Sequence, residues 1–272
     1  MHAARHWLDS PSSLTHGNMI QRVILTREDP GGPQKEGAVL RVFDSLARAY
    51  LEPGVSSLPE VNEGFQEIFF VADGTGTLVT DDGEHPIREG NGVHVPPGVE
   101  HTFVNDGDVP LELIIVVELV PEGTEVESKT ALISNYRENN LTMGHWQQIV
   151  HGVFEGSSTD LIHDRENGLV QRHAILIVRI EAMQTCDNHE LKADKDDVWY
   201  MLKGEGVHVV GEEVIVQTPG MAIQVAPPGH SLINHTEEPL VALCYNAAVY
   251  RVEQDGSYTR ITDSLAGRRG KS

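Results

Sequence analysis

The sequence predicts an all-β protein built from two tandem β-barrels with few short helices. A signature of acidic, glycine, proline, histidine and asparagine residues occurs twice in the 272 residues. The apolar residues fall into runs of about four to nine that are rich in β-branched and aromatic side chains and end at Gly, Pro, Asp or Asn, as strands do. Neither copy of the signature contains a segment with a sustained helical period. The combination is typical of an antiparallel sandwich or barrel that has been duplicated.

The two copies of the signature keep the same spacing over a long distance. The first copy consists of Glu67, Gly74, Gly76, Gly90, Pro97, Gly98, His101 and Asn105. The second copy consists of Asp197, Gly204, Gly206, Gly220, Pro228, Gly229, His230 and Asn234. The copies are 130 positions apart from the acid to the third Gly and 129 apart at the final His and Asn, as one residue deleted from a turn would give. A repeat of this length indicates a duplicated domain, because solenoid repeats span about 20–50 residues.

The predicted strands follow the two copies in order, and they divide the chain into five segments. The clearest strand runs are residues 67–72, 111–119, 174–180, 197–202, 207–216 and 240–245. Hairpin turns are expected at Asp73-Gly74 and Asp81-Asp82-Gly83. The segments are an N-terminal extension (1–37), a first barrel (38–120), a linker or arm (121–171), a second barrel (172–250) and a C-terminal tail (251–272). Within the linker, residues 134–154 are the best candidate for a helix or a packing arm.

Composition and charge limit the classes of partner. The formal net charge is −21 at pH 7, from 41 acidic and 20 basic residues. This balance disfavours nucleic acid, whose phosphates need basic side chains, and anionic membranes. The chain has two cysteines. It has no apolar run of about 18 residues, and its first residues lack the apolar core of a signal peptide. We therefore expect a cytoplasmic protein in a reducing environment, without a nucleic-acid or membrane partner.

The repeated signature resembles the two motifs of the cupin family, and the chain is similar to a bicupin, a protein with two cupin barrels. The matching residues of the first copy are Gly54, Glu67, Gly74, Gly90, Pro96, Gly98, His101 and Asn105. Those of the second copy are Asp197, Gly204, His230 and Asn234, with two residues missing between Gly229 and His230. The resemblance covers residues 38–120 and 172–250. It implies two double-stranded β-helix (jelly-roll) barrels.

The resemblance also implies a metal site in each barrel, because cupins hold a divalent ion with two histidines and a glutamate of the first motif and the histidine of the second. In the first copy the two first-motif histidines become Glu60-Val-Asn62. The candidate ligands of the first barrel are therefore Glu60, Asn62, Glu67 and His101. This set suits a hard or borderline ion such as Mn²⁺, Mg²⁺, Ca²⁺ or Fe²⁺. A three-residue spacing would use Glu63 instead of Asn62, and a barrel without metal would keep these groups for hydrogen bonding.

In the second copy the first-motif histidines become Glu190-Leu-Lys192. An ammonium group at Lys192 opposes metal binding, whereas His189 takes the place of Glu190 if the strand is bulged. The candidate ligands of the second barrel are His189, Glu190, Asp197 and His230. Without metal, Lys192 forms an ion pair with Glu190 or binds an anionic ligand. Lys192, and in the first barrel His94, are the candidates for lining a ligand pocket.

These candidate sites favour a metal-dependent enzyme that acts on a small polar metabolite. The expected cofactor is Mn, Fe, Ni or Zn, and Glu60 or Glu67 would act as ligand or proton carrier. Isomerase, lyase and hydrolase chemistry is preferred to dioxygenation, because the sites are depleted of histidine. The alternative is a non-catalytic small-molecule-binding bicupin scaffold with degenerate metal sites. We expect a homodimer with a small-molecule substrate.

The first copy further resembles one family of bicupins. The stretch from Glu63-Gly64 to Thr102-Phe-Val-Asn105 is similar to the N-terminal barrel of ureidoglycine aminohydrolases, which are manganese bicupins. That family places its ligands in the C-terminal barrel in a Glu-x-His-x-x-x-His pattern. Here the corresponding stretch, Glu190-Leu-Lys-Ala-Asp-Lys-Asp196, has neither histidine. Quercetinase-like and gentisate-like dioxygenases are the other enzyme classes considered.

Overall fold

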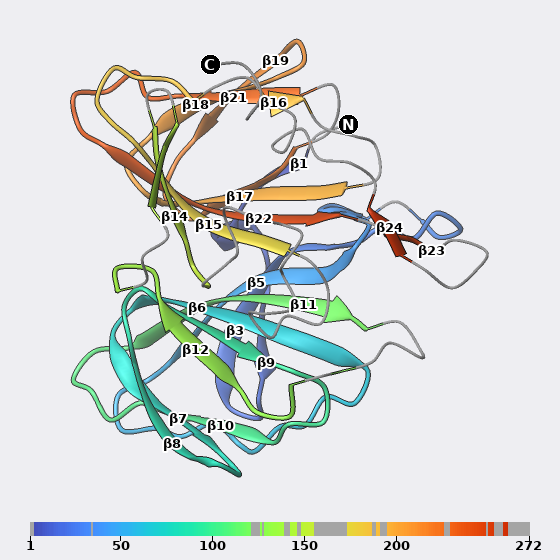
Figure 1. Cartoon of the computed structure of the whole chain (residues 1–272), viewed down its shortest axis with the longest axis vertical. Helices are drawn as coiled ribbons and strands as arrows, with labels where there is room; N and C mark the ends of the chain where they lie inside the picture. Colours follow the sequence, from blue (N-terminus) through green and yellow to red (C-terminus); the bar gives the residue numbers. More distant parts are fainter. Residues whose placement is uncertain are drawn as a thin grey trace.

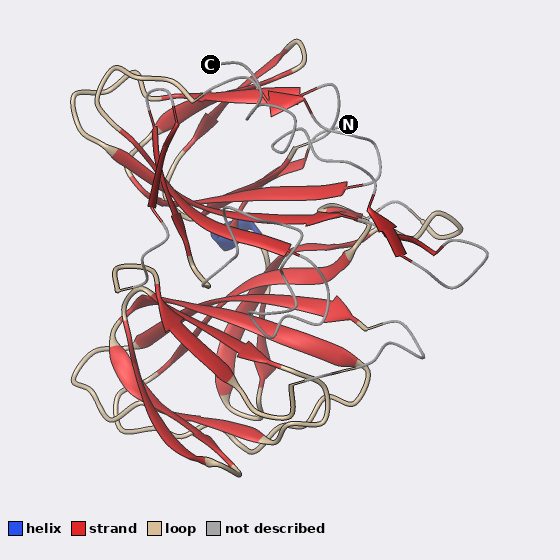
Figure 2. Ribbon diagram, viewed as in Figure 1, coloured by secondary structure: helices blue, strands red, loops and turns tan. Residues whose placement is uncertain are grey.

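The computed structural model of the chain consists of two β-barrels stacked against each other (Figure 1). It describes residues 3–33, 35–120, 126, 128–138, 142–145, 148–154, 173–186, 189–190, 195–225, 229–248, 250–252 and 258–260. Strands dominate these residues, and the short 3-10 helix η1 (Trp7–Asp9) lies between the barrels (Figure 2). The predicted all-β fold with two tandem barrels is confirmed. Among the described residues, no helix is both long enough and apolar enough to cross a membrane.

The first barrel consists of a large sheet facing a small one. The large sheet has the order β12-β9-β6-β11-β5-β3-β2, with β4 paired to β3, and the small sheet has the order β10-β7-β8. The strands are β2 (Ser12–Thr15), β3 (Met19–Arg27), β4 (Ala38–Leu40), β5 (Phe43–Leu51), β6 (Phe65–Asp73), β7 (Thr75–Thr80), β8 (Gly83–Arg88), β9 (Asn91–Val95), β10 (His101–Val104), β11 (Leu111–Leu119) and β12 (Leu132–Asn135).

The second barrel repeats this arrangement. Its large sheet has the order β1-β20-β17-β22-β15-β14-β13, and its small sheet has the order β16-β21-β18-β19. The strands are β1 (Ala3–His6), β13 (Thr142–His145), β14 (Gln148–Gly152), β15 (His173–Ile180), β16 (His189–Glu190), β17 (Lys195–Lys203), β18 (Gly206–Val210), β19 (Glu213–Gln217), β20 (Met221–Gln224), β21 (Gly229–Ile233) and β22 (Leu240–Ala248). A separate pair is formed by β23 (Tyr250–Val252) and β24 (Tyr258–Arg260).

Each large sheet is apolar on both faces, because one face lines its own barrel and the other packs on the neighbouring barrel. On β6, Phe69 belongs to the core inside the first barrel, while Ile68 and Phe70 belong to the core between the barrels. Tyr200 and Tyr245 of the second barrel join that shared core. Successive strand residues point to opposite faces, so a strand buried on both faces is apolar along its whole length. This explains the unbroken apolar runs in the sequence.

A buried carboxylate ties the two barrels together. Asp196 of β17 accepts hydrogen bonds from the backbone N–H groups of Arg41, Val42 and Phe43, at 3.0, 2.7 and 2.9 Å. The side-chain amide of Gln224 donates to the same carboxylate at 3.2 Å. Burial raises the pKa of Asp196 above its ordinary value, although the three backbone donors oppose that shift. The second barrel thus supplies the acceptor for the backbone at the start of β5 and just before it.

The N-terminal segment contributes strands to both barrels. β1 pairs with β20 of the second barrel, with Ala3 opposite Gln224. After η1, β2 and β3 form a hairpin, and β3 pairs with β5 of the first barrel. Trp7 of η1 packs against the core shared by the two barrels. The predicted N-terminal extension therefore contributes strands to both large sheets.

The described part of residues 134–154 is not helical. β12 pairs with β9 of the first barrel, and β13 and β14 form a hairpin that pairs with β15 of the second. Of the two alternatives predicted for this segment, a helix or a packing arm, the helix is wrong for these residues. These strands are the edge strands of the two large sheets, and their formation depends on their pairing partners more than on their own residue pattern.

Gly92 of β9 is expected to be essential for packing. A Cβ atom at this position would meet Phe154 Cζ at 2.9 Å and also collide with Val153, and both neighbours are completely buried. We expect Gly92→Ala to lower the free energy of unfolding by about 1–3 kcal/mol, the usual cost of overpacking. Gly64→Ala is the control, because nothing lies within 4 Å of its Cβ position. Chemical denaturation would measure both, and equal stability of the two variants would contradict the prediction.

Candidate functional site

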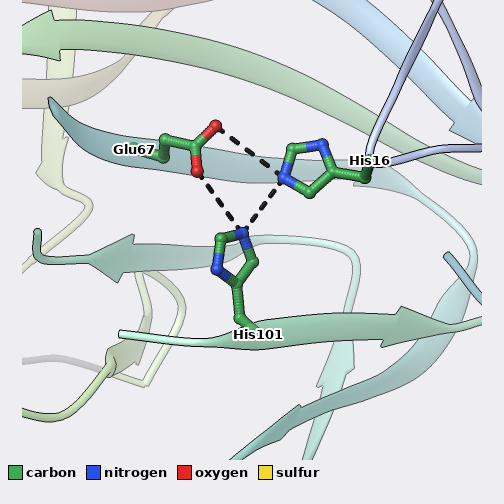
Figure 3. Close-up of side chains that lie close together, drawn as sticks. All are labelled: His16, Glu67 and His101. Atoms are coloured by element: carbon green, nitrogen blue, oxygen red, sulfur yellow. Dashed lines mark hydrogen bonds and ion pairs between the residues drawn. The ribbon is translucent and has the colours of Figure 1, made fainter. Parts of the chain in front are cut away.

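Three side chains converge inside the first barrel: His16, Glu67 and His101 (Figure 3). His16 Nε2 lies 3.0 Å from His101 Nε2 and 3.7 Å from Glu67 Oε1. His101 Nε2 lies 3.4 Å from Glu67 Oε2. The exposed fractions of the three residues are 4%, 4% and 1%. They form the group of potential metal ligands found among the described residues.

The three side chains come from distant parts of the sequence. Glu67 is on β6, and His101 is the first residue of β10. His16 lies in the turn between β2 and β3 with a φ of +47°, and Gly17 follows with a φ of +77°. A positive φ is uncommon outside glycine and is often found where function fixes the backbone. The β2–β3 turn therefore holds the His16 imidazole inside the barrel.

The surroundings of the three groups are apolar. The ring of His16 meets Phe69 edge-on, with centroids 5.7 Å apart, and His101 meets the same ring at 5.8 Å. Phe103 packs against Phe69, with ring centroids 4.7 Å apart, and its own ring lies 5.9 Å from that of His101. In such an environment, charges interact more strongly than in water, and an ionised carboxylate needs a cation or hydrogen-bond donors.

Each of the three groups has a further partner that orients it. Thr15 Oγ1 lies 3.0 Å from His16 Nδ1, and the Asn62 amide donates to Glu67 Oε2 at 2.6 Å. His101 Nδ1 donates to the carbonyl oxygen of Val99 at 3.2 Å. This bond leaves Nε2 as the nitrogen of His101 that carries the lone pair facing the other two groups. Partners of this kind orient the ligands of metal sites.

The electrostatic environment keeps the site in the form that binds a cation. Burial by itself raises the pKa of Glu67, but the interaction with His16, the charge of His101 and the Asn62 hydrogen bond bring it below its ordinary value. Burial lowers the pKa of His101, and the charge of Glu67 only partly offsets that shift. Both shifts favour an ionised carboxylate beside a neutral imidazole, which are the protonation states that ligate metals.

The geometry fits a divalent metal. Ligand atoms 3.0–3.7 Å apart match donors that share one ion at about 2.0–2.2 Å. Two imidazoles and one carboxylate suit Fe²⁺, Mn²⁺, Ni²⁺ or Zn²⁺, and a set of three leaves coordination positions open for a substrate. The residues present therefore fit the ion that the sequence resemblance implied.

The structure brings Glu67 and His101 together and arranges the other two predicted ligands around them. Glu60 forms a backbone bridge with His101, with N–H···O distances of 3.0 Å in both directions, and its half-buried side chain is outside the group of three. Asn62 directs its amide N–H, rather than its oxygen, at Glu67. His16 supplies the ligand atom that the motif spacing had assigned to Glu60 or Asn62. The pattern missed His16 because it lies outside the cupin-like motif.

His94 lies away from this site. Its neighbours Val93 and Val95 belong to the core inside the barrel, and His94 between them faces the opposite side of β9. There His94 Nε2 lies 2.9 Å from Gln66 Oε1, and Gln66 donates to Glu118 at 2.7 Å. All three are fully buried. His94 thus belongs to a polar cluster on the face of the sheet that meets the second barrel.

In the second barrel, the structure brings Asp197 and His230 into the interior. His230 Nε2 lies 3.9 Å from Asp197 Oδ2, and both residues are buried. His189 and Glu190 form the short strand β16, in which His189 is paired with His230. Lys192 lies outside the described residues. The register thus places His189, not Glu190, opposite the motif histidine.

Comparison with known proteins supports the fold. Residues 47–117 match the cupin domain family. An uncharacterized protein of Methanocaldococcus jannaschii is 27% identical over 108 residues, covering 35% of this chain and 86% of that protein. A structure from Pseudomonas aeruginosa that bears the name glyoxylate-induced protein superimposes with a TM-score of 0.70 at 16% identity, covering 97% of this chain and 91% of the other. A variant of Bacillus subtilis oxalate decarboxylase superimposes with a TM-score of 0.68 at 12% identity, covering 91% and 79%.

Proposed function

We propose that this chain, a bicupin by fold, is a divalent-metal-dependent enzyme whose working site lies in the first barrel and acts on a small polar metabolite. The observation that carries the proposal is the buried triangle of His16, Glu67 and His101, with ligand atoms 3.0–3.7 Å apart. The fold by itself assigns no reaction, since one fold hosts many chemistries. The donor set and its surroundings support the choice.

The residues divide into ligands and a proton carrier. His16, Glu67 and His101 would hold the ion, which supplies Lewis acidity toward a carboxylate or carbonyl oxygen of the substrate. Asn62 keeps the Glu67 carboxylate in place through its hydrogen bond of 2.6 Å. Glu60 is half-buried, and its charge acts on His101, so it is the candidate for moving a proton.

The interior of the barrel favours a small substrate. Phe69, Phe103 and Leu78 are completely buried in the core inside the first barrel, and the rings of Phe69 and Phe103 contact the site. One structural neighbour is an oxalate decarboxylase with Mn(II) centres, and another is named for induction by glyoxylate. Small carboxylic acids are therefore the first substrates to test, with Mn²⁺ and Fe²⁺ as the first ions.

Metal content and turnover of His101→Ala test this proposal. The untagged full chain would be loaded with Mn²⁺ or Fe²⁺, analysed by inductively coupled plasma mass spectrometry and assayed with oxalate, glyoxylate and related acids. We expect His101→Ala to lose one equivalent of metal and all turnover, because it removes a ligand. The control is His85→Ala, which removes a part-exposed histidine whose ring contacts Thr80 and Asp82 at the surface. Equal metal content in wild type and His101→Ala would refute the assignment.

A non-catalytic binding scaffold is the second candidate, and one observation favours it. The 3.0 Å contact between the two Nε2 atoms of His16 and His101 allows a hydrogen bond that closes the triangle without a metal. A protein that takes up no ion at this site, yet binds a small acid measured by calorimetry, would support the scaffold over the enzyme.

A further inference from the structure

A polar cavity of about 670 Å³ lies in the first barrel, where β3 ends and β4 and β5 begin. Thr26 of β3 and Ser45 of β5 are half-buried in its lining, and the loop between β3 and β4 forms its rim. The volume is in the range of sites that bind small molecules. The three ligands of the proposed metal site are not among the lining residues, so this cavity is a separate feature of the barrel.

Two β-bulges occur in the strands that line this cavity. On β5, Asp44 is the extra residue, because the register with β11 shifts between Val117 and Glu118. On β3, Ile24 is the extra residue, and the register with β5 shifts around it. A bulge bends its strand and redirects a side chain, and bulges are frequent beside functional sites. In the second barrel, β15 takes the place of β5 and pairs with β14 and β22 without a shift over its described pairs. The barrel fold therefore does not require these bulges.

A contact with the second barrel fixes the position of Asp44. The Asp196 carboxylate accepts hydrogen bonds of 2.7–3.0 Å from the backbone N–H groups of residues 41–43. Asp44 is the next residue along the chain and lines the cavity. A group that is already held in place loses less conformational entropy when a ligand binds.

Charges of both signs line the cavity without pairing with each other. Asp44 is half-buried, and its carboxylate has no ion pair or hydrogen bond with any residue that the structure describes. The exposed Lys35 on the rim likewise forms no ion pair within the described part of the chain. Arg27 donates one hydrogen bond, to the carbonyl oxygen of Arg41 at 3.1 Å, and its guanidinium keeps further N–H donors.

The rest of the lining narrows the class of ligand. Glu28 forms an ion pair with Arg41 at 3.5 Å, and Asp29 accepts a hydrogen bond of 3.1 Å from a backbone N–H of its own loop. These two carboxylates therefore already have partners. Val23 and Ala38 contribute an apolar wall. The cavity thus presents one unpaired carboxylate, two cations and an apolar surface to a ligand.

We propose that this cavity binds a free α-amino acid with an apolar side chain, whose ammonium group contacts Asp44 and whose carboxylate contacts Lys35 and Arg27. A ligand that carries both charges matches both sides of the cavity, whereas an anion or a cation alone matches one side only. Guanidinium groups bind carboxylates through paired hydrogen bonds. The inference does not depend on the proposed metal site, because it uses none of the metal ligands.

Calorimetric titration of the metal-free full chain with L-leucine, L-methionine and L-phenylalanine tests this inference. We expect at least one of these amino acids to bind with one site per chain. Its amide derivative lacks the carboxylate and its N-acetyl derivative lacks the ammonium group. Each derivative should bind about 10-fold or more weakly, because it loses hydrogen bonds between charged groups. No binding of any of the three amino acids, or equal affinity of the parent and either derivative, would overturn the inference.

Two variants locate the bound amino acid. Asp44→Asn should weaken the binding of the amino acid about 10-fold or more and leave that of the N-acetyl derivative unchanged. Lys35→Gln removes one of two cations on an exposed rim, so it should weaken the amino acid about 2- to 5-fold and leave the amide unchanged. Lys35 is exposed and unpaired within the described chain, so Lys35→Gln keeps the test open if Asp44→Asn folds poorly.

Two control variants complete the experiment. Glu52→Gln removes an exposed carboxylate just after β5, outside the lining, and should bind the amino acid as wild type does. His101→Ala should also bind it as wild type does. Loss of amino-acid binding in His101→Ala, with binding unchanged in Asp44→Asn, would place the ligand at the metal site and overturn this inference. Metal content of His101→Ala tests the proposed enzyme separately.

Discussion

His16→Ala is expected to lower the metal affinity of the first barrel by at least about 100-fold, although His16 lies far outside the cupin-like motif. Removing a residue that only orients a ligand lowers metal affinity by about 10- to 100-fold. His16 lies where it would bind the ion directly, so its removal should cost more. Its Nε2 atom is 3.0 Å from His101 Nε2 and 3.7 Å from Glu67. Without it, a carboxylate and a single imidazole remain. The measurement is the dissociation constant for Mn²⁺ in the His16→Ala and wild-type chains.

Two further variants make this result interpretable. His16→Gly removes the imidazole and suits the φ of +47° better than alanine does, so a shared loss of affinity excludes backbone strain as the cause. His235→Ala removes an exposed histidine beside Glu205 in the second barrel and should bind metal as wild type does. If His16→Gly bound Mn²⁺ as tightly as wild type, His16 would not be a ligand.

The largest effect on stability is expected from Asp196→Ala. Its carboxylate accepts three backbone N–H groups of Arg41, Val42 and Phe43 across the junction of the barrels. Each buried donor left without an acceptor costs about 1–3 kcal/mol. We expect a loss of at least about 3 kcal/mol in the free energy of unfolding, measured by urea denaturation. A change below about 1 kcal/mol would show that this junction contributes little.

The companion variant Asp196→Asn keeps an acceptor oxygen and removes the ionisable group, so it should cost less than Asp196→Ala. It also isolates a pH effect. Because the folded pKa of Asp196 is raised, its proton-linked contribution to stability is present below the ordinary pKa of aspartate. It is lost as the pH rises through the raised value. The stability advantage of wild type over Asp196→Asn should therefore shrink from acid to neutral pH.

The fold could be predicted from the sequence because its signals are local. Glycines such as Gly74 and Gly204 mark turns with positive φ, and both are found at φ +84° and +77°. The apolar runs between the turns match strands β6 and β11 closely. The sheet edges were less predictable, because edge strands such as β13 are defined by their partners and not by their own periodicity.

The sequence predicted Glu67 and His101 of the candidate site but not His16, for a physical reason. His16 reaches Glu67 through the pairing of β3 with β5, which no spacing within a motif can report. In the second barrel, the register of strand pairing determines which residue lies opposite His230. A shift of one residue would place Glu190 there instead of His189 and would move every side chain of the strand to the other face.

The shared N-terminal segment has a consequence for how the chain assembles. β1 begins at Ala3, whereas its partner β20 spans Met221–Gln224, so the two strands that pair are far apart in the sequence. Pairings this distant in sequence are slow to form. Until they do, the β20 edge stays open to other strands, a recognised route to aggregation. Because β1 leads through η1 to the turn bearing His16, late closure of the second sheet would also set when the first barrel becomes competent to bind its ion.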